Sequence, residues 1–145
     1  MDSVEINFKN YLIKKDTLTF EEMENLHVSI LESANSIDEE FLEIWQDLIE
    51  SAIDYTKIRA EWNFYSKDKK MEVDSMRTNK HDNVIITFLM LERFMIQKKW
   101  SIEWTKQLFL QDIISNRTKK DVVESRKRIG DFANYLAFIY ALNGR

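Results

Sequence analysis

Two residues near the middle of the chain have the types and spacing of an acid–base site. Arg77 and His81 are four residues apart, which places both on one face of a helix, and Asp74 precedes Arg77 by three residues. Histidine is the usual general base near neutral pH. The alternative is a solvent-exposed first helical turn, in which an ion pair of this spacing stabilises the helix by only about 0.2–0.5 kcal/mol.

A second candidate is Asp131, which with Asn134 interrupts the apolar run near the end of the chain. A buried carboxylate without a partner costs several kcal/mol, so we expect Asp131 to be paired if it lies inside. Arg93, equally isolated in an apolar segment, is the leading partner, with Arg77 or His81 next. We favour an ion pair that locks two core helices over a catalytic carboxylate. The neighbouring Gly130 is expected to admit a close helix approach or to mark a kink.

The ligand types needed for a metal site are scarce. The chain has no cysteine, and His27 and His81 are its two histidines, too far apart to share a helical face. Five carboxylates follow one face of the third expected helix: Glu39, Glu43, Asp47, Glu50 and Asp54. Such a stripe could bind divalent cations or mimic nucleic acid, but it is more typical of the solvated side of a bundle helix. We therefore expect no metal and no cofactor.

The backbone that must position these residues lacks the usual helix breakers. The chain contains no proline and two glycines, Gly130 and Gly144, in 145 residues. Apolar residues recur at helical spacing and no segment alternates like a strand. The sequence predicts an all-α fold, a single-domain bundle of about six helices over residues 1–145.

Capping signals divide the chain into these helices. A short first helix over about residues 3–15 precedes a capping box at Thr19 and Glu22, which opens a second helix over about 20–34. Ser36 and Glu39 repeat the pattern and open a third helix to about Tyr65. The aperiodic stretch 66–74 is expected to be the main connection. Three further helices are expected over 75–143. The fourth is apolar on nearly every side over Val84–Ile96, which predicts that it is buried all round. Ser101 caps a fifth helix, and a sixth begins at Thr118 with Asp121 and ends with a C-cap at Asn143–Gly144.

Charge is divided between the two parts of the chain. Residues 1–66 carry 15 acidic and 5 basic residues, a net charge of −10, whereas residues 67–145 carry 10 acidic and 16 basic residues, a net charge of +6. This asymmetry could hold the two parts together or drive association with a partner or a second copy. The densest basic cluster is Arg117, Lys119, Lys120, Arg126, Lys127 and Arg128. Without a helix-turn-helix pattern or interleaved aromatics, it does not lead us to expect nucleic-acid binding.

The run from Arg126 to Tyr135, with Ile129-Gly130-Asp131-Phe132-Ala133 as its most specific part, resembles a small bacterial family of unknown function. Arg77, His81 and Ser101–Trp104 are similar to it too, so the resemblance covers about residues 75–145. The family has no established activity, substrate or cofactor. The resemblance implies a helical bacterial protein and assigns no catalytic residue.

These observations favour recognition of another protein, or of a second copy, over catalysis. The alternatives are a small enzyme with a polar pocket formed by His81, Arg77, Arg93 and Asp131, and an acidic inhibitor that mimics nucleic acid. The absence of cysteine, of a basic and apolar leader, and of an apolar segment of about 20 residues leads us to expect a cytoplasmic protein that does not contact a membrane.

Overall fold

The computed structural model describes residues 17–62, 64–109 and 119–142. Within these ranges the chain is all-α, as predicted, and contains no strand. The elements are α2 (Phe20–Ser33), α3 (Glu39–Trp62), α4 (Lys67–Gln97), α5 (Thr105–Phe109), α6 (Lys119–Ala137) and a terminal π-helical turn, η2 (Phe138–Leu142). The expected first helix, Thr118 and the expected C-cap at Asn143–Gly144 lie outside the described residues.

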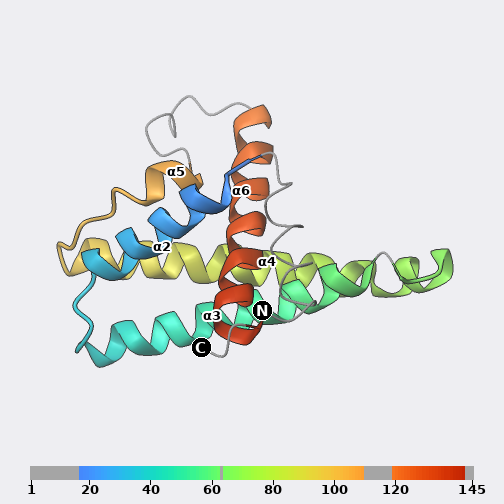
Figure 1. Ribbon diagram of the computed structural model, residues 1–145, viewed down its shortest axis with the longest axis horizontal. Coiled ribbons are helices and arrows are strands. Elements are labelled where there is room, and N and C mark those ends of the chain that lie inside the picture. Colours follow the sequence, from blue (N-terminus) through green and yellow to red (C-terminus); the bar gives the residue numbers. More distant parts are fainter. Residues whose placement is uncertain (1–16, 63, 110–118, 143–145) are drawn as a thin grey trace.

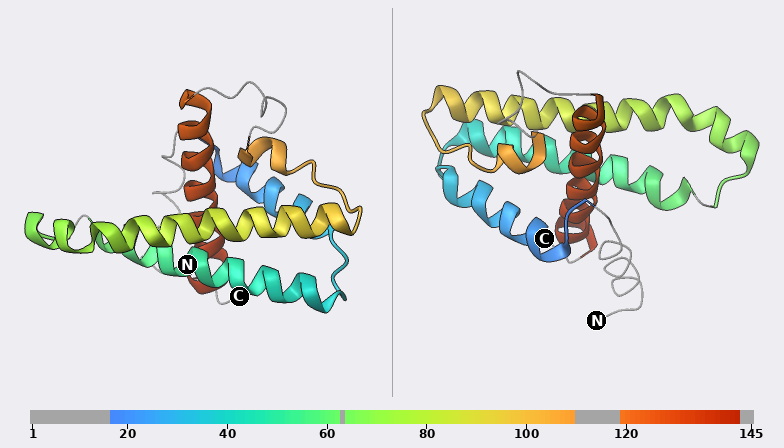
Figure 2. Two further views of the ribbon diagram at one scale, coloured as in Figure 1. Left: turned by 180° about the vertical axis from the view of Figure 1, so that it is seen from behind. Right: turned by 90° about the horizontal axis from the view of Figure 1, so that it is seen from above.

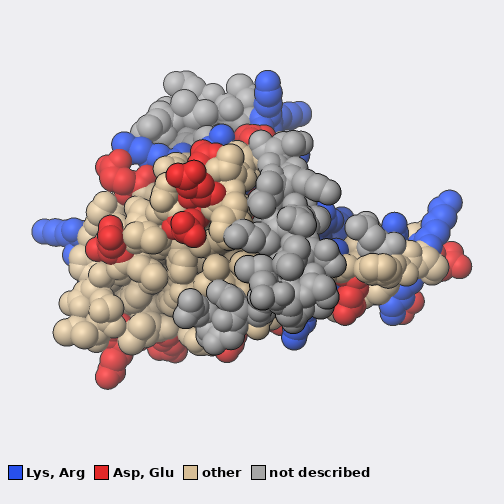
Figure 3. Space-filling view, in the orientation of Figure 1, with Lys and Arg blue, Asp and Glu red and all other residues tan. Residues whose placement is uncertain are grey.

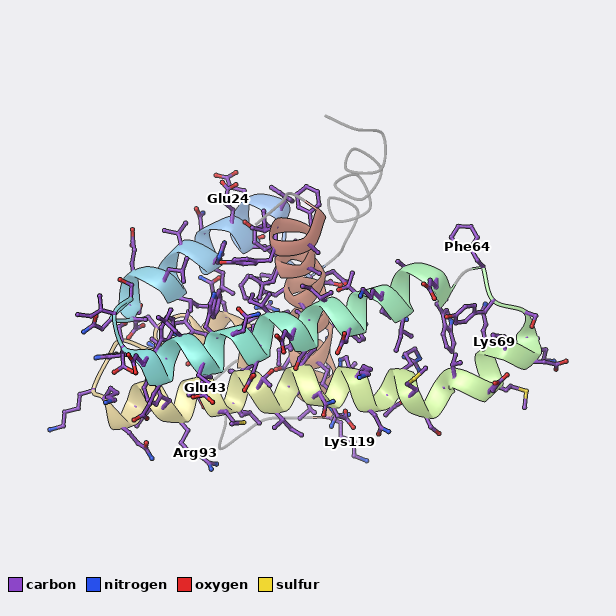
Figure 4. All side chains as sticks on the ribbon, turned by 90° about the horizontal axis from the view of Figure 1, so that it is seen from below. Glu24, Glu43, Phe64, Lys69, Arg93 and Lys119 are labelled. Carbon is purple, nitrogen blue, oxygen red and sulfur yellow. The ribbon has the colours of Figure 1, made fainter. Side chains whose placement is uncertain are left out.

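Two long helices form the base of the molecule (Figure 1). α3 and α4 run antiparallel as a hairpin, and α6 crosses both of them steeply. α2 and α5 lie on the same side of the hairpin as α6, near the end where α4 finishes (Figure 2). The other end of the hairpin, where α3 is joined to α4, projects beyond the remaining helices and carries Phe64 and Lys69 at its tip (Figure 4).

The core is built around the second half of α6. Ile129, Phe132, Ala133, Tyr135 and Leu136 are each at most 1% exposed. The Phe132 ring lies 5.7 Å from the ring of Phe88 on α4, and the Tyr135 ring lies 5.3 Å from that of Phe20 on α2. Burial of this apolar face is the main contribution that holds α6 across the hairpin.

At the end of α6, His27 joins three helical elements. Its ring stacks on Trp45 of α3 at 5.9 Å, and its Nε2 lies 2.8 Å from the Tyr140 hydroxyl on η2. Burial lowers the pKa of His27 below the usual 6.5, because the charged imidazolium loses hydration there.

One of the two predicted capping boxes is correct. Thr19 and Glu22 cap α2 reciprocally, each side chain accepting a hydrogen bond from the other residue's backbone N–H at 3.0 Å. The box expected at Ser36 and Glu39 is wrong, because Asp38 takes the cap position of α3. Asp38 Oδ1 accepts a hydrogen bond from the Phe41 N–H at 3.0 Å, and this bond lowers the pKa of Asp38.

The connection expected over residues 66–74 is also wrong. Ser66 caps α4, which begins at Lys67, and α3 ends at Trp62 rather than near Tyr65. This part of α4 belongs to the projecting hairpin, where it lies beside α3 and beyond the other described helices (Figure 4). Few apolar residues are needed there: Val73 is buried, and the Arg77 guanidinium lies 4.9 Å from the Trp62 ring.

The expectation that Val84–Ile96 is buried on every side holds for one side of α4. Val84, Phe88, Leu91 and Met95 are fully buried, whereas four large apolar residues on the other side are 41–52% exposed: Ile86, Leu89, Met90 and Ile96. The expected cap at Ser101 is wrong, because α5 begins at Thr105, after a turn in which Thr105 donates to the Ile102 carbonyl. None of the described helices has the length and apolarity required to cross a bilayer.

Candidate functional site

An open pocket of about 540 Å³ lies where α3, α4 and α6 meet. This volume is in the range that holds small organic ligands. Its walls come from Tyr55 and Arg59 on α3, from the Arg77–Asp82 turn of α4, and from one face of α6 over 123–131; Thr17, before α2, closes part of the rim.

Gly130 allows the three helices to approach each other at this pocket. A Cβ atom on Gly130 would lie 3.3 Å from the Tyr55 hydroxyl and 3.8 Å from Nε2 of His81. The His81 ring packs edge-on against the Tyr55 ring at 5.4 Å. A larger residue at position 130 would therefore displace the Tyr55 or His81 side chain, and the expected close helix approach is found.

Arg77 is held in place by two contacts on the projecting hairpin. Its Nη2 donates to Asp74 Oδ1 at 2.9 Å, as the three-residue spacing suggested, and its guanidinium lies over the Trp62 ring. Its Nε–H is shielded from solvent and has no acceptor among the described residues. The Arg77 side chain as a whole is 30% exposed, and a guanidinium held in place at the pocket in this way is suited to binding an oxyanion.

Three more cations line the pocket: Arg59 on α3, and Arg126 and Lys127 on α6. Among the side chains that the structure describes, none of these three cations has a recorded ion pair with a carboxylate.

The acidic residues of the lining are engaged differently. Asp131 is half-buried, and its Oδ2 accepts a hydrogen bond from the Thr17 hydroxyl at 2.6 Å. Asp82 Oδ1 lies 3.7 Å from Nδ1 of His81, and Glu124 Oε1 lies 3.6 Å from Nε of Arg128. Each of the three carboxylates thus has a polar partner within the protein.

The structure brings together three of the four residues suggested for a polar pocket. Arg77, His81 and Asp131 all line it. The fourth, Arg93, is exposed on the outer edge of α4 and points away from the body, so the expected Asp131–Arg93 pair is wrong (Figure 4). An isolated charge in an apolar run suggests a residue that faces the core, but Arg93 lies on the exposed side of α4, opposite the side that packs against the described helices.

Sequence reasoning missed Arg59 and Tyr55 as site residues. Both lie in the apolar stripe of α3, and a basic residue in such a stripe was the signal that could have identified Arg59. Arg126 and Lys127 were noticed as part of a basic cluster, without a connection to Arg77 or His81.

The carboxylate stripe of α3 is exposed along its length, at Glu39, Glu43, Asp47, Glu50 and Asp54. Asp54 lies 3.7 Å from Nζ of Lys80, so a cation neutralises one end of the stripe. The mimicry hypothesis required a stripe without adjacent cations. On the face shown in Figure 3, acidic side chains also gather over α2.

In the described part of the chain, no three carboxylates or imidazoles converge as a metal-ion site would need.

Comparison of the chain with protein-family models, curated proteins and solved structures gives no match. The resemblance noted at residues 75–145 therefore stays a prediction, and the argument for function depends on the geometry of the pocket.

Proposed function

We propose that this chain binds a small molecule bearing an oxyanion, a phosphate or a carboxylate, in the pocket between α3, α4 and α6. The observation that carries the proposal is the convergence of four cations from three helices, Arg59, Arg77, Arg126 and Lys127, on one pocket. The lining also has three carboxylates, Asp82, Glu124 and Asp131, so the four cations exceed the anions by one charge. A bound oxyanion supplies the counter-charge for this excess.

The remaining lining favours a ligand with a polar body beside the anion. Asp131 can accept a hydrogen bond from a hydroxyl or amino group, and His81 can donate or accept one. His81 is also the group that would act as a general acid or base if the bound molecule reacts, which is the enzymatic form of this proposal. The segments that resemble the bacterial family, Arg77 with His81 and 126–131, meet in this pocket, which supports treating it as the functional centre.

Isothermal titration with sodium phosphate, pyrophosphate and citrate at constant ionic strength tests the proposal. The two phosphates and the tricarboxylate distinguish the possible oxyanions. Arg126→Gln with Lys127→Gln is expected to weaken binding of the best probe about tenfold, which corresponds to about 1.4 kcal/mol. Lys119→Gln with Lys120→Gln removes the same charge from exposed positions on the same helix outside the pocket, and should leave the affinity within about twofold. Equal losses in both variants, or no binding of any probe at millimolar concentration, would contradict the proposal.

A second candidate function, contact with another protein or a second copy, is favoured by the uncovered side of α4. Four large apolar residues 41–52% exposed on one helix are more than scattered surface residues. From the sequence we also propose that the protein is bacterial and that it is cytoplasmic. Sedimentation of the purified protein separates self-association from binding to a different protein, because only self-association raises its mass.

A further inference from the structure

The uncovered side of α4 has the spacing of a coiled-coil seam. Exposed residues recur along it in alternating steps of three and four over nearly three heptads: Asn79, Asp82, Ile86, Leu89, Arg93 and Ile96. The apolar members are 52%, 41% and 52% exposed in chain order, and Met90 beside them is 50% exposed. A helix that needed to cover only its own core would not maintain apolar residues at this spacing on its outer side.

We infer that this seam pairs with the same seam of a second copy, antiparallel, about a two-fold axis that passes between residues 87 and 88. In an antiparallel pair, the first apolar position of one heptad packs beside the fourth position of the partner helix. This register places Ile86 beside the second copy's Leu89, so that the two apolar pairs lie at the centre. It also places Asn79 beside the second copy's Ile96.

Charge complementarity selects this register and this orientation. The same register places Arg93 beside the second copy's Asp82, and the two-fold axis repeats that ion pair at the other end. Arg93 forms no ion pair within the described part of its own chain, and the Asp82 side chain is 52% exposed. A parallel pairing would instead place Arg93 on Arg93 and Asp82 on Asp82. A shift by one heptad would set Arg93 against the apolar Leu89, leaving its charge without a partner.

The contact shares one residue, Asp82, with the lining of the proposed pocket, whereas Ile86, Leu89, Arg93 and Ile96 are not lining residues. The Ile86→Glu variant described below therefore tests the contact without changing the pocket. A two-helix contact of this length is small, so a dissociation constant in the micromolar range, about 1–100 µM, is expected.

Sedimentation equilibrium from 5 to 500 µM tests the pairing. The natural chain should move from 17.5 kDa towards twice that mass over this range. Ile86→Glu should abolish the shift, whereas Val28→Glu, at a residue 46% exposed on α2, should leave it unchanged. A natural chain that stays at 17.5 kDa at 500 µM, or an equal response of the two variants, would overturn the inference.

Charge reversal tests the ion pair. Arg93→Glu and Asp82→Arg should each weaken the dimer at least tenfold, because each change affects two contacts. The double variant should recover most of the affinity, since it exchanges the two charges. A double variant as weak as the two single variants would contradict the register.

Cross-linking tests the orientation, because the chain has no native cysteine. Asn79→Cys and Ile96→Cys proteins, mixed and oxidised, should form a mixed disulfide dimer. Each variant alone should not cross-link, because the two copies of position 79 would lie about 25 Å apart along the paired helices. Cross-linking of Asn79→Cys with itself would show a parallel pair and would overturn the inference.

Discussion

Thr56→Val should destabilise the protein through a single buried hydrogen bond that joins α3 to α6. The Thr56 hydroxyl donates to Asn134 Oδ1 at 2.8 Å, and the two residues are 7% and 2% exposed. Valine has nearly the same shape as threonine but leaves the Asn134 oxygen buried without a donor. That loss costs about 1–3 kcal/mol. For a chain of this size, about 3 °C per kcal/mol gives a fall in melting temperature of about 3–9 °C.

Two variants make this prediction specific. Thr87→Val removes a hydroxyl that donates to carbonyls of its own helix, and should change the free energy of unfolding by no more than about 0.5 kcal/mol. Adding Asn134→Leu to Thr56→Val replaces both polar partners and should recover part of the loss. The reasoning is refuted if thermal unfolding followed by circular dichroism gives Thr56→Val and Thr87→Val the same melting temperature.

Two further predictions concern His27 and Gly130. Burial lowers the pKa of His27 in the folded state, so the unfolded chain binds the proton more tightly. The contribution of His27 to the free energy of unfolding should therefore be fully present well above pH 6.5 and be lost as the pH falls below 6.5. Melting temperatures measured from pH 7.5 to 5 should depend less on pH in His27→Gln than in the natural chain, and an equal pH dependence in the two proteins would contradict this. Gly130→Val adds a side chain whose Cβ alone would lie 3.3 Å from the Tyr55 hydroxyl, tighter than an ordinary contact. The variant should melt several degrees lower and bind oxyanions more weakly in calorimetry, and this expectation fails if the variant binds like the natural chain.

The helical part of the fold was predictable because several local signals agreed. The near absence of proline and glycine, the Thr19 capping box and the apolar spacing of α6 all indicated helices, and the structure has them. The start of α3 was not predictable in this way, since Ser36 and Asp38 are both good capping residues. Asp38 is selected by contacts distant in sequence, among them its carboxylate 3.5 Å from Nζ of Lys98.

The beginning of α4 was missed for a different reason. Apolar periodicity reports burial, and the projecting hairpin buries little, so residues 67–74 are helical without the pattern. The cap at Ser66 was the remaining local signal.

The sequence predicted those parts of the candidate site in which residues lie close together because of their spacing along one helix. Arg77 and His81 share a face, and Gly130 precedes Asp131, so each pair was visible in the sequence. Which helices would face each other was not visible. Arg93 was assigned to the pocket because it is isolated among apolar residues, but only the packing of α4 against α3 and α6 shows that this residue points outward.

The amide resonance of Gly130 offers the most direct measurement of the proposed pocket. The chain has only two glycines, so two backbone peaks appear in the glycine region of a proton–nitrogen correlation spectrum. Gly130 lines the pocket. Titration with pyrophosphate at constant ionic strength should shift the Gly130 peak to saturation, whereas sodium chloride added over the same concentration range should leave it in place. Citrate in a parallel titration covers a carboxylate ligand. A Gly130 peak that moves with neither probe, or that moves equally with sodium chloride, would contradict an oxyanion site between α3, α4 and α6.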